Sequence, residues 1–135
     1  MKNKLLLLTF LLLMTIANSY GQELDSLPSV LNPEKKAAFT NGMNGWIKFL
    51  ESSLDHGLLY KMQAPRGSYR VLGNFLIDTL GNVSDIRIEK DPGYGAATEF
   101  KRVIKLSSGK WVPAYDNGKA VPFRQKQSLT LLQNF

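Results

Sequence analysis

The 135-residue sequence contains no cysteine and a single histidine. The absence of cysteine excludes disulfide bonds and a lipid-modified cysteine, so the folded part must be stabilised by its hydrophobic core. The histidine, His56, has no second histidine and no cysteine with which to build a metal site or a catalytic triad. We therefore interpret His56 as a residue that interacts with the last carbonyl groups of a helix.

Sequence motifs that carry catalysis are also missing. There is no Gly-rich phosphate loop, no zinc-ligand spacing and no nucleophile elbow. Asp78, Asp85 and Asp91 flank turns or exposed strand positions, where aspartate hydrogen-bonds the nearby backbone. We therefore predict that the protein is not an enzyme and that it uses no metal ion, no cofactor and no small-molecule substrate.

Positive charge is in modest excess. The chain has 17 Lys and Arg against 11 Asp and Glu, and two of the lysines, Lys2 and Lys4, belong to the N-terminal segment. Without them the balance is 15 minus 11, or +4. The basic residues form no cluster of the kind that binds nucleic acid, so we expect no nucleic-acid partner.

The N-terminus has the order of a secretory signal peptide. Lys2 and Lys4 precede an almost wholly apolar run from Leu5 to Ile16, and small and polar residues follow up to Gln22. The run is shorter than the roughly 20 residues of a membrane-spanning helix. We predict a signal peptide over residues 1–21, which takes the chain out of the cytoplasm; the alternative is an uncleaved segment that anchors the chain in the membrane.

Beyond the signal peptide we predict a lead-in over residues 22–39 and one domain over residues 40–135. The lead-in is polar and carries two prolines, which indicates loose packing. In the domain, hydrophobic periodicity and turn residues predict a helix, two strands of a hairpin, a second helix, a short extended stretch and a last strand. Their ranges are 44–54, 69–78, 83–90, 96–106, 111–114 and 121–132. This order indicates the α+β class, with two helices on one face of a small, mainly antiparallel sheet.

Several motifs resemble the C-terminal domain of TonB, in the form found in Bacteroidetes-type energy transducers. They include the stretches Phe75-Leu76-Ile77-Asp78, Asp91-Pro92-Gly93-Tyr94-Gly95 and Lys110-Trp111-Val112-Pro113-Ala114. The residues that carry the likeness are Phe75, Asp78, Gly81, Pro92, Gly93, Gly95, Trp111, Pro113, Asn117 and Gly118. The resemblance covers about two-thirds of the chain, from about Trp46 to Phe135, and implies a periplasmic domain with a three-stranded antiparallel sheet.

The resemblance also implies a partner. In that family the domain captures the TonB box, a short extended peptide of outer-membrane TonB-dependent receptors, by pairing it with the free edge of the last strand, which is β-augmentation. Carried over to this chain, the partner-binding residues are Phe123, Arg124, Gln125, Lys126, Gln127, Ser128 and Leu129. The alternative is an envelope assembly module that forms a homodimer through the same edge and has no transport role.

This sequence departs from the family in one respect. Full energy transducers have an inner-membrane anchor and a long Pro- and Lys-rich spacer, whereas here the predicted lead-in is short. We therefore expect peptide binding rather than the transmission of force.

Overall fold

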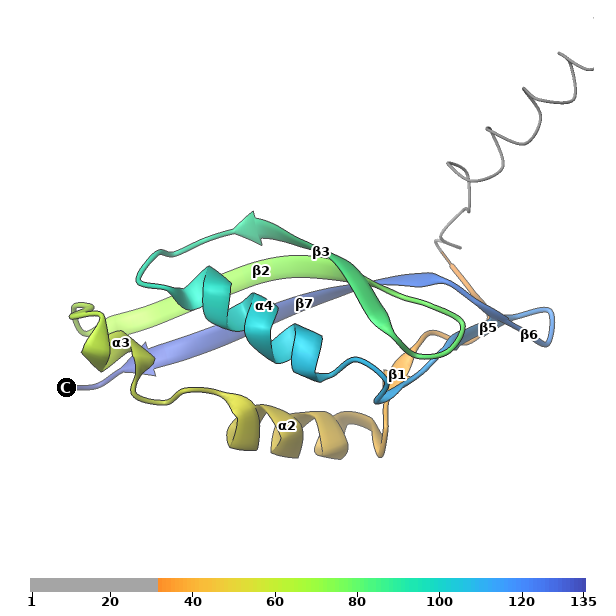
Figure 1. Ribbon diagram of the computed structural model, residues 1–135, viewed down its shortest axis with the longest axis horizontal. Helices are drawn as coiled ribbons and strands as arrows, with labels where there is room; N and C mark the ends of the chain where they lie inside the picture. The colour runs from red at the N-terminus through yellow and green to blue at the C-terminus, as the bar shows by residue number, and fades with distance from the viewer. Residues whose placement is uncertain (1–31) are drawn as a thin grey trace, which may run out of the picture.

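The computed structural model describes residues 32–135 and confirms the predicted α+β class (Figure 1). Its centre is a three-stranded antiparallel sheet in the order β3-β2-β7. The strands are β2 (Gly67–Ile77), β3 (Val83–Lys90) and β7 (Phe123–Gln133). Because β2 lies between the other two, β3 and β7 are the edges of this sheet.

The described residues do not include the predicted signal peptide or the part of the lead-in before residue 32. Within residues 32–135, no helix is both long and apolar enough to cross a membrane.

Within the described residues three helices accompany the sheet: α2 (Gly42–Ser53), α3 (Leu58–Lys61) and α4 (Ala96–Leu106). Figure 1 shows α4 lying across the sheet and α2 running beside it. The bounds of β3 and α4 agree with the prediction, whereas α3 falls in a stretch that we predicted to be an irregular connection.

Four short strands form two further ladders. Strand β1 (Ala38–Phe39) pairs with β4 (Trp111–Val112), and β5 (Ala114–Asp116) pairs with β6 (Lys119–Val121). The β5–β6 turn has positive φ at Asn117 and Gly118, as a tight hairpin requires. This hairpin lies between the predicted extended stretch over residues 111–114 and the predicted last strand over residues 121–132.

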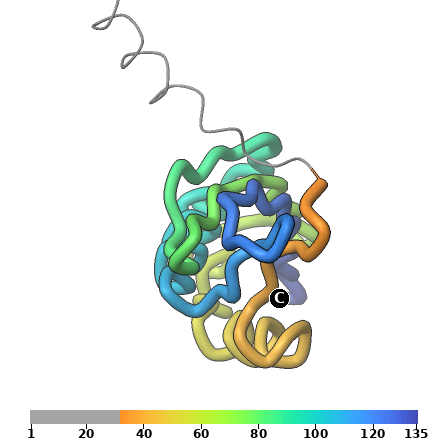
Figure 2. Tube along the Cα trace, turned by 90° about the vertical axis from the view of Figure 1, so that its right-hand side faces the viewer, coloured from red at the N-terminus to blue at the C-terminus, as the bar shows by residue number. Residues whose placement is uncertain are grey.

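The end of the predicted lead-in is not loosely packed, which corrects that prediction. Lys35 exchanges backbone hydrogen bonds with Tyr115, and Phe39 is buried in the core. Figure 2 shows this segment, in orange, passing along the body of the molecule before it enters α2. The folded unit therefore begins before residue 40. The sequence did not predict this, because a strand of two residues is formed by its partner and not by a pattern of its own.

The alternation of apolar residues along β2 determines which face of the sheet is buried. Val71, Phe75 and Ile77 point into the core, and Gly73 lies between them. A methyl group on Gly73 would lie 2.7 Å from the Phe100 ring, so the glycine leaves the space in which α4 approaches the sheet.

The turn of the β2–β3 hairpin is held by Asp78. Its carboxylate oxygen Oδ1 accepts hydrogen bonds from the backbone N–H groups of Leu80 and Asn82, each at 2.9 Å. Gly81 has φ +81°, and a methyl group there would lie 2.1 Å from the backbone oxygen of Trp111. The turn thus packs directly against β4, which explains why a glycine is needed at this position.

Helix α2 begins earlier than the predicted start at residue 44. Its N-cap position is Asn41, because β1 ends at Phe39 and the chain must reverse at once. Trp46 is buried and Leu50 packs against the core, as the apolar periodicity of the helix predicts, whereas Ile47 is 45% exposed. The aromatic rings of β1 and β4 orient the helix: the centroid of Trp46 lies 5.2 Å from those of Phe39 and Trp111.

Candidate functional site

Strand β7 offers a long edge for strand addition. It pairs with β2 along its full 11 residues, from Ile77↔Phe123 to Gly67↔Gln133, without a register shift. Within residues 32–135, its other edge pairs with no strand. In an antiparallel ladder, about half of the backbone N–H and C=O groups of an edge strand point away from its neighbour. These groups of β7 are available to a further strand.

The opposite edge of the sheet is less suited to strand addition. The β2–β3 ladder contains two register shifts, and Asp85 in β3 has a positive φ of 47°. Bulges and charged side chains are the devices by which edge strands avoid pairing with other chains. The two register shifts give β3 such irregularities, which β7 lacks. Of the two edges, β7 is therefore the better suited to strand addition.

The predicted partner-binding residues divide between the two faces of β7. Phe123 and Leu129 are buried on the face that carries the helices, so these two contribute their backbone and not an accessible side chain. Gln125 and Gln127 point to the same face but line a pocket. The alternate residues Arg124, Lys126 and Ser128 therefore lie on the opposite, open face.

Charged side chains on the open face are engaged within the sheet. Arg124 of β7 forms an ion pair with Asp85 of β3 and donates a hydrogen bond of 2.8 Å to Asn74 Oδ1. Lys126 Nζ lies 3.4 Å from Glu89 Oε2. Hydrogen bonds from Arg87 and Arg124 hold the pKa of Asp85 below its ordinary value. The two cations of β7 thus interact with strands on the side away from the free edge.

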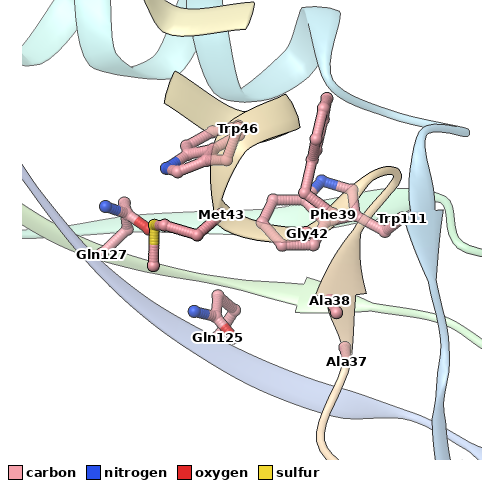
Figure 3. Close-up of a pocket in the computed structure, with 9 residues that line it drawn as sticks. All are labelled: Ala37, Ala38, Phe39, Gly42, Met43, Trp46, Trp111, Gln125 and Gln127. Carbon is pink, nitrogen blue, oxygen red and sulfur yellow. The ribbon is translucent and has the colours of Figure 1, made fainter. Parts of the chain in front are cut away.

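A pocket of about 170 Å³ opens on the inner face beside this edge (Figure 3). It lies between β7, β1 and the first turns of α2. Its floor is aromatic, and its lining includes no ionisable side chain. The lining residues are Ala37, Ala38, Phe39, Gly42, Met43, Trp46, Trp111, Gln125 and Gln127.

The two tryptophans that line the pocket differ in their hydrogen bonding. Trp111, which is buried, donates from Nε1 to Ser107 Oγ at 2.9 Å. Trp46 is only 5% exposed, and its Nε1 has no hydrogen-bond partner among the described residues. In Figure 3 this nitrogen lies on the side of the ring that faces Gln127. An unpaired buried donor is costly, so a group that accepts a hydrogen bond there would be favoured.

The other residues of the family resemblance lie in turns and in the core. Phe75 is fully buried, while Asp78 and Gly81 form the β2–β3 turn. The Asp91 side chain accepts from Gly93 N–H at 2.8 Å in the turn that leads into α4. The remaining five are Pro92 in that same turn, Gly95 at the N-cap of α4, Pro113 between β4 and β5, and Asn117 and Gly118 in the β5–β6 turn. Of the ten, only Trp111 reaches the pocket.

Most of the residues that line the pocket were not predicted from the sequence to belong to a functional site. Trp46 comes from the predicted helix over residues 44–54, Met43 lies just before that predicted start, and Ala37 and Ala38 come from the predicted lead-in. The sequence around Trp46 gives no sign that its indole nitrogen will lack a partner. Within residues 32–135, no group of three or more His, Asp or Glu residues is arranged as a metal site.

Comparison of the chain with models of known protein families finds no match, and a search of characterised proteins also finds none.

Proposed function

We propose that this chain is a periplasmic peptide-binding domain of the TonB C-terminal type. It captures the TonB box of an outer-membrane TonB-dependent receptor by β-augmentation on the free edge of β7. The observation that carries the proposal is the 11-residue edge strand, regular along its full length, whose outer side pairs with no strand within residues 32–135. The proposal also places the domain in the periplasm, after removal of residues 1–21.

The physical basis of such binding is the backbone of β7. Each peptide residue that pairs with the edge satisfies N–H and C=O groups that otherwise bind water, and this supplies affinity for any extended chain. Selectivity then depends on the side-chain surfaces that flank the edge. On the inner face this surface is the pocket lined by Gln125 and Gln127.

Titration of the full chain with synthetic TonB-box peptides of receptors from the same organism tests the proposal. Amide hydrogen exchange of β7 should slow on peptide addition, and it should slow at alternate residues, because only every second amide faces the free edge. Uniform protection of β7, protection of β3 alone, or no binding at millimolar peptide would contradict it.

Proline substitutions at three successive positions, Gln125→Pro, Lys126→Pro and Gln127→Pro, provide the matched mutational test. Where the lost N–H faces β2, the ladder is broken and the melting temperature should fall sharply. Where it faces the free edge, proline is tolerated, so the melting temperature should be largely retained while peptide binding is lost. This alternation cannot arise from general damage to the fold.

The same edge also supports the alternative function, which is self-association. Two copies of β7 can pair edge to edge, and an assembly module would use that contact in place of a peptide. A self-paired edge would exclude the peptide, so the two functions compete for the same backbone groups.

A further inference from the structure

The pocket beside β7 is positioned to receive one side chain of a peptide bound at the edge. A strand added to β7 would lie about 4.8 Å away, with alternate side chains on the inner face. Side chains opposite Gln125 or Gln127 would be about 4.5–5.5 Å from them and would point into the space below α2. This inference rests on the proposed function, because it requires a peptide on that edge.

The size and lining of the pocket limit its occupant. At about 170 Å³ it is smaller than the roughly 300 Å³ at which small-molecule sites begin, so it suits a single side chain. None of its lining residues carries a charge, so a charged side chain would lose its hydration without gaining an ion pair.

The polar groups around the pocket are complementary to a primary amide. The donor is Trp46 Nε1–H, which is buried without a partner among the described residues. The amide nitrogens of Gln125 and Gln127 donate to the backbone oxygens of Lys126 and Ser128, at 3.3 and 2.9 Å. This orientation leaves the side-chain oxygens of the two glutamines as acceptors. A primary amide offers both a carbonyl acceptor for the indole and N–H donors for these oxygens.

We propose that the pocket recognises a primary amide side chain, that of glutamine or asparagine, at an inward position of the bound peptide. The indole of Trp46 donates to the amide oxygen, and Gln125 or Gln127 accepts from the amide nitrogen. An aliphatic side chain of similar size leaves the indole N–H unpaired, and a carboxylate would face the oxygens of both glutamines.

Selection from a library of random nine-residue peptides displayed on phage, with the full chain as bait, tests the preference without assuming a receptor. Selected peptides that bind at the free edge of β7 should carry glutamine or asparagine at one fixed position. Replacement of that residue by leucine or glutamate should weaken binding about five-fold or more, the effect of one lost hydrogen bond. If peptides bind at the β7 edge but show no preference for an amide side chain, the amide inference is wrong and the proposed function stands. If no selected peptide binds at the β7 edge, both the inference and the proposed function are wrong.

The indole protons provide a direct readout, because the chain has only two tryptophans. Binding of a selected peptide should move the Trp46 indole N–H resonance downfield, as a new hydrogen bond does, and leave that of Trp111 nearly unchanged. Trp46→Phe removes the donor while keeping a ring, so it should abolish the discrimination between glutamine and leucine; because Trp46 is buried, the smaller ring should also lower the melting temperature. Trp111→Phe is the matched control and should retain the discrimination.

An unmoved Trp46 resonance in the wild-type complex would overturn the inference whether or not the variants fold.

Discussion

At the scale of single residues, Glu99 shows how a charge in the core can connect two helices. Its carboxylate accepts the backbone N–H of Asp55 at 3.0 Å and pairs with Arg102. Arg102 in turn donates to the carbonyl oxygen of Ser53, the last residue of α2, at 2.6 Å. The Glu99 side chain is only 7% exposed. One carboxylate thus joins α4 to the end of α2, and the periodicity of α4 did not predict it.

Replacement of Glu99 by glutamine should lower the free energy of unfolding by about 1.5–3 kcal/mol, the range for hydrogen bonds to a charged group. The hydrogen bond from Arg102 holds the pKa of Glu99 below its ordinary value of 4.5. A carboxyl group with a lowered folded pKa stabilises the fold above its unfolded pKa, and this contribution disappears as the pH falls through the folded value. Chemical denaturation across the acid range should therefore give a flatter stability profile for Glu99→Gln than for the wild type.

The exposed Glu51 of α2 supplies the control for this prediction. Glu51→Gln changes the same chemical group without a buried partner, so its effect should be within about 0.5 kcal/mol. Equal losses for the two variants, or parallel acid profiles for Glu99→Gln and wild type, would show that the Glu99 contacts contribute little.

At the scale of elements, the contact between the β2–β3 turn and β4 determines where the chain enters its last strands. Gly81 N–H donates to the Asp78 carbonyl at 3.1 Å, and the Gly81 carbonyl accepts from Gly109 N–H at 3.0 Å. The turn is therefore bound both to its own hairpin and to the segment that follows α4. This segment continues through Trp111 toward β7, so the hairpin helps to position β7.

Alanine substitutions at two glycines with similar φ distinguish the cost of backbone strain in a turn from the cost of a steric clash with a neighbouring strand. Gly81→Ala and Gly118→Ala both place a side chain at positive φ, +81° and +73°. Each should cost about 1–2 kcal/mol from this strain alone. At Gly81 the methyl group also meets the Trp111 backbone, whereas nothing lies within 4 Å at Gly118. Thermal unfolding should thus show Gly81→Ala to be the less stable variant by a further 1–3 kcal/mol or so, and equal losses would contradict the packing of the turn on β4.

The elements that could be predicted from the sequence are those with a strong local pattern. The apolar alternation of β3 and the apolar stripe of α4 lie between clear turn signals, and both bounds were predicted. Strand β1 and helix α3 have 2 and 4 residues, too few to show a period. They form because Phe39 meets Trp111 and because Leu59 is buried in the core.

The candidate site was predictable only in its backbone part. Strand β7 follows from its extended pattern, and the resemblance to the TonB C-terminal domain indicated its edge. The pocket depends on contacts of Phe39 and Trp46 with Trp111, which lies far from both in the sequence. The missing partner of Trp46 Nε1 is a property of the folded arrangement, so no local pattern reports it.

At the scale of the whole molecule, the decisive question is what occupies the edge of β7 in solution. Over residues 32–135 the central sheet has three strands, and β7 forms one of its two edges along 11 residues. Edges of this kind pair with other chains unless they are protected. Arg124 and Lys126 protect this edge poorly, since they interact across the open face with Asp85 and Glu89.

Sedimentation of the full chain with and without peptide distinguishes the two occupants. If β7 is a peptide-binding edge, any dimer should be weak and concentration-dependent, and saturating peptide should convert it to a monomer, because peptide and second copy need the same N–H and C=O groups. The proline variant that loses peptide binding but keeps its melting temperature should then be monomeric at every concentration. A stable dimer that peptide cannot displace, and that the same variant abolishes, would instead assign the edge to self-association.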